Sequence, residues 1–237
     1  MYVDSAQPGD ILLFKRSPSK CAASPVAALS CLAQSYQEYN HIGLVVPHPT
    51  DKYKMGIYEC TVGAGIRVMD LSDRIKLSRS DEILLVPLNV PGERRGEEEE
   101  GGGGKKKFKL VEKYREELRR EIWGVVKANV AMSKANNYDM MHGSLSFFGG
   151  ISRRLPLSET TKAMVYKGPV NPSCMFVLDA LSKAGVLDRR QGGKVMEEVL
   201  RGSDCGQFGT VSMGREREGD IMLRPGFRYG RGVVVKS

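Results

Sequence analysis

A single cysteine stands at the start of an apolar stretch late in the chain, in a pattern that suits a nucleophile. The segment PVNPSCMFVLDALSKAGVL, residues 169–187, carries turn formers before Cys174 and apolar residues at helical spacing after it. We expect Ser173 to cap this helix and Gly185 to end it, which puts Cys174 in the first turn. The unpaired N–H groups and the dipole at a helix start favour a thiolate and could hold an oxyanion. The alternative is that Cys174 is a small buried core residue, as free cysteines often are.

A nucleophilic thiol needs a base, and the chain has three histidines: His41, His48 and His142. His48 lies in the turn-forming sequence PHPTD, and His142 lies in the loop-like sequence MMHGS. His41 begins the run HIGLVV, which predicts a strand whose end could present the imidazole to a cleft. His41 is therefore the candidate base, and a half-buried structural histidine is the alternative.

The base in turn needs an orienting group, and Glu59 is the candidate. It lies in MGIYECT, which predicts the strand returning from His41. A hairpin that turns near Thr50 sets His41 opposite Glu59, where a carboxylate could hold the imidazole tautomer. A shift of one residue sets His41 opposite Cys60 instead, and the turn is too long to fix the register. The alternative for Glu59 is a surface charge on an alternating strand.

The rest of the chain predicts an α+β scaffold for these residues, with an antiparallel sheet packed against helices. Apolar runs bounded by turn residues predict the strands, and apolar residues at helical spacing predict the helices. The expected strands cover 9–14, 41–46, 55–61, 66–71 and 82–88, with two closing strands in 219–226 and 232–236; the expected helices cover 24–36, 71–78, 108–134, the segment after Ser173, and 193–201.

Composition indicates one globular domain over residues 1–237. The low-complexity stretch PGERRGEEEEGGGGKKK, at about 91–107, is expected to be a disordered surface insertion. The net charge is +8, but the basic residues are scattered and not interleaved with aromatic residues, so we expect no nucleic-acid binding. Five cysteines without a CxxC pair argue against a disulfide framework and a zinc site. No signal sequence and no spanning apolar run is evident, so we expect a cytoplasmic protein.

Five motifs in a fixed order resemble those of circularly permuted NlpC-like, papain-related hydrolases of the YiiX type. They are PGDILLF, NHIGLVV, YEC with GIRVMDL, NYDM, and PSCMFVLDALSKAGV. They span residues 9–187 apart from the insertion. The resemblance implies a permuted papain-like fold, in which the histidine strand precedes the cysteine helix. It also implies cleavage of an amide bond in a peptide or small molecule, through an acyl-enzyme and without a cofactor or metal.

The resemblance also implies roles for single residues. Cys174 is the expected nucleophile, His41 the general base and Glu59 the orienting residue. Asp10 matches a position taken as structural, and Tyr138, Ser173 and Asp10 are the candidate pocket residues. The family often has a tyrosine or another polar residue before the cysteine, and Ser and Glu after it. Here Ser173 precedes it and Met175 follows, which bears on the substrate more than on the chemistry.

Two other functions suit the same sequence. A lipid-directed thiol acyltransferase or esterase would use the same site, and the basic charge and the helix expected over 24–36 could serve a membrane surface. Against it, the chain has no Asn-Cys-Glu-His-type motif and no hydrophobic C-terminal anchor. The other alternative is a binding module that keeps the scaffold without catalysis.

Overall fold

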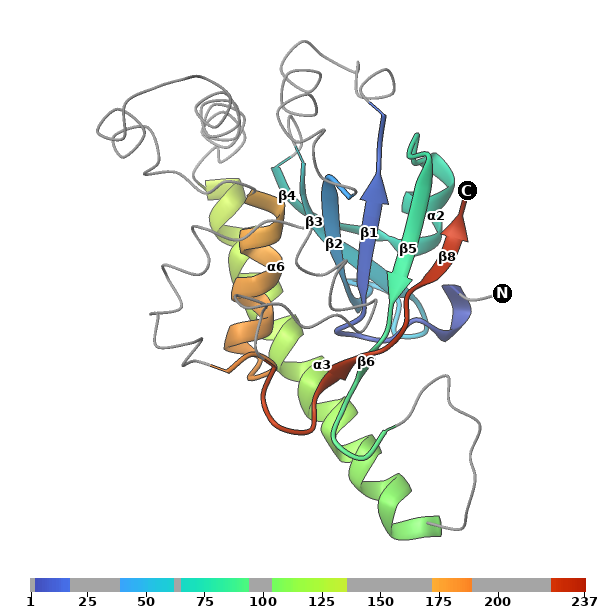
Figure 1. The fold of residues 1–237 in the computed structure, drawn as a ribbon. Helices are drawn as coiled ribbons and strands as arrows, with labels where there is room; N and C mark the ends of the chain where they lie inside the picture. The colour runs from blue at the N-terminus through green and yellow to red at the C-terminus, as the bar shows by residue number, and fades with distance from the viewer. Residues whose placement is uncertain (1–2, 18–38, 62–64, 94–103, 136–171, 189–222) are drawn as a thin grey trace, which may run out of the picture.

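A computed structural model gives the fold of the protein (Figure 1). The structure describes residues 3–17, 39–61, 65–93, 104–135, 172–188 and 223–237. Its elements, in chain order, are η1 (Val3–Ser5), β1 (Ile11–Lys15), β2 (His41–Pro47), β3 (Met55–Thr61), β4 (Gly65–Asp70), α2 (Leu71–Leu77), β5 (Glu82–Val86), β6 (Leu88–Asn89), α3 (Gly104–Ala135), α6 (Pro172–Lys183), β7 (Arg228–Tyr229) and β8 (Val233–Lys236).

The central element is a six-stranded sheet with the order β4-β3-β2-β1-β5-β8 and antiparallel pairing throughout. Strands β1 to β4 follow one another across the sheet, and β5 then pairs with the other edge of β1. A second, short ladder joins β6 and β7. The expected α+β class with an antiparallel sheet is therefore confirmed, and the predicted strands at 41–46 and 55–61 match β2 and β3 closely.

Each face of the sheet is covered by its own helices (Figure 1). Helices α3 and α6 pack on one face, in a cluster that includes Ile42 and Tyr58. The other face carries Phe14 and Val45 and is covered by α2. Because side chains alternate along a strand, adjacent residues of β2 point to different helices.

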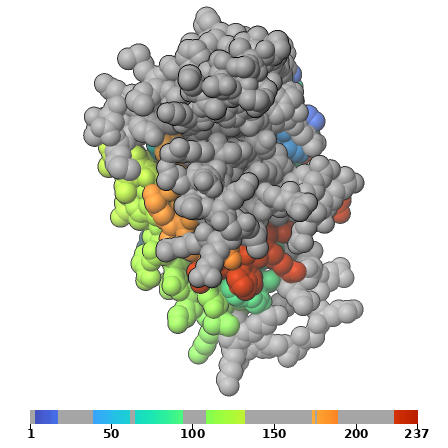
Figure 2. All heavy atoms as spheres, turned by 60° about the vertical axis from the view of Figure 1, so that its left-hand side comes forward, coloured from blue at the N-terminus to red at the C-terminus, as the bar shows by residue number. Residues whose placement is uncertain are grey.

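Helix α3 has the predicted apolar stripe, but only its middle part packs fully. Leu118, Ile122 and Val126 are buried, whereas Leu110 is 48% exposed. The first turns of α3 extend past the sheet, which lies too far along the helix to cover that part of the stripe (Figure 1). Figure 2 shows α3 and α6 lying next to each other on this side of the molecule.

The bounds of α6 differ from the expected ones at its start. The helix begins at Pro172, a residue suited to a first helical position, so Ser173 lies inside the first turn and does not cap it. At the other end Gly185 has φ +73°, and its N–H donates to the carbonyl of Ser182. The predicted glycine stop is confirmed.

Several predictions meet the described residues only in part. Within the 91–107 segment, Pro91–Glu93 form a turn and α3 begins at Gly104, while 94–103 lie outside the described residues. Strand β8 confirms the closing strand expected in 232–236. The other closing strand was expected in 219–226. Residues 219–222 lie outside the described residues, and Leu223 forms a single bridge with Leu187. The helices expected over 24–36 and 193–201 also lie outside them. None of the described helices is long and apolar enough to cross a lipid bilayer.

Candidate active site

His41 occupies the first position of β2 and is only 6% exposed. It pairs with Phe14 of β1 across the ladder, and the two rings lie 5.2 Å apart at an angle of 49°. A side chain on a central strand, packed against an aromatic ring, has few rotamers open to it. The expected base is therefore held on a rigid support.

Glu59 of β3 lies beside this imidazole. Its Oε2 is 2.9 Å from His41 Nε2, and the residue is 1% exposed. The register differs from both alternatives considered above: Leu44 pairs with Tyr58, so at the same count Gly43 faces Glu59. His41 and Glu59 are diagonal neighbours on one face, a separation that a glutamate side chain spans.

Two arginines hold the other side of the Glu59 carboxylate, and the sequence analysis did not identify either. Arg67 donates from Nε and Nη2 to Oε1, at 3.1 and 2.8 Å. Arg74 donates from Nε to both oxygens at 2.9 Å, and its guanidinium lies over the ring of Phe14. Arg67 faces Glu59 across β3 and β4, a cross-strand charge pair that alternation in GIRVMD could have suggested. Arg74 comes from α2, and no local pattern indicates its contact.

These neighbours set the charge states of the pair. Burial alone would raise the pKa of Glu59, but the His41 hydrogen bond and the nearby positive charges outweigh burial and hold that pKa well below its usual range. Burial lowers the pKa of His41 from 6.5 to about 4; the hydrogen bond with Glu59 opposes this, and the charges of Arg16 and Arg74 add to it. The imidazole is thus neutral near pH 7 and the carboxylate is ionised.

The proton of the neutral imidazole can be assigned from this arrangement. An ionised carboxylate only accepts, so Nε2 carries the proton and donates it to Glu59. Nδ1 then has a free lone pair and points toward the start of α6. His41 is consequently in the protonation state and orientation of a general base for a group in that turn.

Ser173 is the residue whose side chain, among those described in that turn, contacts the base. Its Oγ lies 3.2 Å from His41 Nδ1 and also donates to the backbone carbonyl of Cys60 at 2.6 Å. The single hydroxyl proton cannot serve both acceptors fully, and the carbonyl is the closer one. The contact with Cys60 also fastens the start of α6 to the end of β3.

Cys174 is next in the chain but points elsewhere. It is fully buried, in the cluster that α3 and α6 form with Ile42 and Cys60 on one face of the sheet. His41 alternates with Ile42 and packs on Phe14, which belongs to the opposite face. Of the side chains that the structure describes, Ser173 and not Cys174 reaches Nδ1. The structure brings His41, Glu59 and Ser173 together and leaves the Cys174 thiol in the core.

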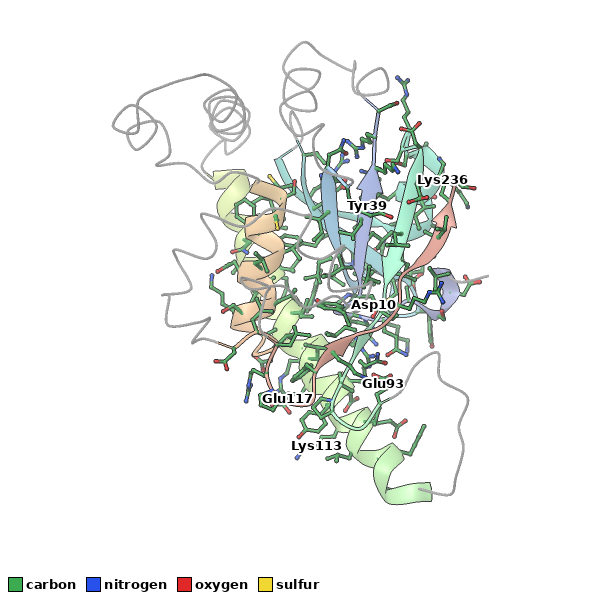
Figure 3. The ribbon with its side chains drawn as sticks, viewed as in Figure 1. Asp10, Tyr39, Glu93, Lys113, Glu117 and Lys236 are labelled. Carbon is green, nitrogen blue, oxygen red and sulfur yellow. The ribbon has the colours of Figure 1, made fainter. Side chains whose placement is uncertain are left out.

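Of the two remaining expected residues, the structure describes only Asp10, which lies apart from this cluster. Asp10 sits before β1, at the end of that strand away from His41 (Figure 3). Its carboxylate is fully buried and accepts the backbone N–H groups of Gln7 and Leu88, each at 2.9 Å, which agrees with the expected structural position. Tyr138 lies outside the described residues.

Comparison of the chain with protein-family models and with curated proteins found no match.

Proposed function

We propose that the chain is a hydrolase that cleaves an amide bond through an acyl-enzyme formed at the first turn of α6. Cys174 is the nucleophile, His41 the general base and Glu59 the residue that orients the base. One observation supports this most: His41 is held between the Glu59 carboxylate at Nε2 and the start of α6 at Nδ1. His41, Glu59 and Ser173 are all buried. A buried base aimed at a helix start is the arrangement that nucleophilic catalysis needs.

The proposed chemical steps require a first turn of α6 that presents the Cys174 thiol to His41. The sulfur attacks the carbonyl carbon while the thiol proton passes to His41 Nδ1. Backbone N–H groups of the first turn stabilise the oxyanion. The C–N bond then breaks, and the imidazolium returns its proton to the departing amine. A water molecule, deprotonated by His41, hydrolyses the thioester, releasing a carboxylic acid and the free thiol.

The permuted papain-like fold is part of the same proposal. Its support is the order of the elements, since the histidine strand precedes the candidate cysteine helix and that helix packs on the antiparallel sheet beside it. The substrate class that suits this chemistry is a peptide or small-molecule amide.

Ser173 is a second candidate for the nucleophile, because its hydroxyl is the group within 3.2 Å of Nδ1. Adjacent residues of an α-helix are about 100° apart around its axis. For the Cys174 thiol to reach His41, the first turn of α6 must rotate by a comparable angle or the thiol must leave the core. A serine attack needs no such rotation, but the hydroxyl must give up its bond to the Cys60 carbonyl.

The test is acylation by p-nitrophenyl acetate, followed by peptide mass spectrometry to locate the acetyl group. The proteins compared are wild type, His41→Ala, Cys174→Ala and Ser173→Ala. Acetyl on Cys174 that depends on His41 and is removed by neutral hydroxylamine supports the thiol mechanism. If the acetyl group is on Ser173 and resists hydroxylamine, Ser173 and not Cys174 is the nucleophile of the same mechanism. Equal acylation in wild type and His41→Ala, or none in either, contradicts the proposed function.

A further inference from the structure

A hollow lies at the opposite end of β2 from His41, about 20 Å away by the length of the strand. It has a volume of about 1030 Å³ and lies between residues 47–52, in the turn after β2, and residues 113–127 of α3. Its lining shares no residue with the candidate active site. Whatever it binds is therefore separate from the proposed chemistry.

One wall of the hollow combines an aromatic ring with an absent side chain. Trp123 lines it, and beside it, among the described residues, only the chain neighbours of Gly124 and the backbone of its own helix can lie within 4 Å of the place where a Gly124 Cβ would be. A glycine inside a helix costs about 1 kcal/mol relative to alanine, and no packing contact among the described residues requires a glycine at this position. The helix surface beside the indole is thus left open for an apolar group.

The rest of the lining is charged, with an excess of cations. Five lysines and arginines and three carboxylates line it, which gives an excess of two positive charges. Arg119 donates to the Lys52 carbonyl at 3.1 Å and so ties the turn to the helix. Lys127 lies over the Trp123 ring, at 5.9 Å. Figure 3 shows Lys113 and Glu117 projecting from the same side of α3.

We propose that this hollow is a docking site for an acidic peptide segment with apolar side chains. Its carboxylates would pair with Lys113 and Lys127, for which the described residues provide no ion-pair partner, and an apolar side chain would pack on Trp123 over Gly124. Glu116 and Glu117 disfavour a ligand with closely spaced charges, such as a nucleoside triphosphate. A peptide with spaced carboxylates can reach the cations of the lining while avoiding its carboxylates. The proposal does not depend on the hydrolase activity.

Trp123 is the single tryptophan of the chain, so its fluorescence reports directly on the hollow. The probe is a blocked synthetic peptide in which glutamate alternates with leucine. We expect a saturable change in tryptophan emission, with an affinity that falls as salt rises. A peptide in which lysine alternates with leucine serves as the charge control, and ATP tests the nucleotide alternative.

Three variants make the test specific. Gly124→Leu fills the open surface without lowering helix propensity. The double variant Lys113→Glu with Lys127→Glu reverses the two cations. Each of these two proteins is expected to bind the acidic peptide about tenfold more weakly. Lys109→Glu reverses one lysine on α3 outside the hollow and should leave the affinity unchanged. Three results would overturn the proposal. They are no saturable change with the acidic peptide, saturable binding of ATP or of the basic peptide instead, and equal loss of affinity in Lys109→Glu.

Discussion

His41 is the residue whose surroundings decide what can happen at the start of α6. Burial and the charges of Arg16 and Arg74 lower its pKa to about 4, while the ionised Glu59 carboxylate fixes its proton on Nε2. A neutral imidazole with its lone pair toward the helix removes a proton during attack. We therefore expect general-base catalysis and not a thiolate–imidazolium pair formed in advance.

The first prediction concerns the pH dependence of stability. The unfolded chain binds a proton at His41 near pH 6.5, whereas the folded protein does so only near pH 4. Unfolding therefore takes up a proton in this window, and stability falls as pH drops through it, by about 3 kcal/mol at most. Urea unfolding at a series of pH values should show this fall in wild type and not in His41→Gln. Parallel profiles for the two proteins would contradict the lowered pKa.

Glu59 carries the second prediction. Glu59→Gln keeps the shape of the side chain but leaves Arg67 and Arg74 facing a neutral amide. Breaking a buried ion pair in this way is expected to cost about 3 kcal/mol and to slow acylation as the imidazole loses its fixed tautomer. Asp70→Asn is the matched control, since its partner Lys54 is exposed and the pair, at 4.0 Å, should be worth within about 1 kcal/mol. Equal loss of stability in the two variants would show that Glu59 is an ordinary surface charge.

At the scale of elements, the strands that carry the base and its carboxylate were predictable from sequence. HIGLVV and MGIYECT are apolar, β-branched runs bounded by turn residues, and they form β2 and β3. Their register was not predictable, because the connection over 48–54 does not fix it. The diagonal contact of His41 with Glu59 depends on that register, and the contact of Arg74 with Glu59 depends on how α2 packs on the sheet. Both therefore come from tertiary packing.

The start of α6 shows the same limit. Turn formers and apolar spacing predict the helix and its glycine stop, but the residue that faces the base depends on how the helix is rotated about its axis. That rotation is set by packing on α3 and the sheet, and by the bond from Ser173 to the Cys60 carbonyl. A one-residue difference in the first turn decides between a thiol and a hydroxyl at Nδ1.

A third prediction separates the elements that hold the fold from those that hold the site. Asp10→Ala leaves the N–H groups of Gln7 and Leu88 without their charged acceptor, inside the protein. We expect a loss of about 3 kcal/mol in unfolding free energy. Because Asp10 lies at the far end of β1, the rate of acylation at α6 should stay as in wild type below the unfolding transition. A large loss of acylation in the folded variant would place Asp10 in the site.

At the scale of the whole molecule, α3 is the element that joins the remote hollow to the core. Leu118, Ile122 and Val126 pack in the same cluster as Cys174, while Trp123 and Gly124 face the hollow. The core face of α3 thus belongs to the packing that positions α6.

A fourth prediction follows from this shared core. Ile122→Ala removes a fully buried side chain, and we expect it to destabilise the protein by about 3 kcal/mol. Urea unfolding followed by Trp123 fluorescence and by far-ultraviolet circular dichroism should give one coincident transition that shifts together in the variant. Glu121→Ala, an exposed change next to it, should shift neither. Separate transitions would mean that α3 folds independently of the sheet.

The most direct test of the central claim is the rate at which iodoacetamide labels Cys174 as a function of pH, read by peptide mass spectrometry. Cys60 is the internal control, because it is a cysteine outside any disulfide and is buried in the same cluster. Near neutral pH, where the neutral His41 imidazole can take the thiol proton during attack, we predict that Cys174 labels about tenfold faster than Cys60 or more, and that His41→Ala abolishes the difference. If Cys174 and Cys60 label at the same rate in both proteins, Cys174 is a core residue and the thiol mechanism is wrong.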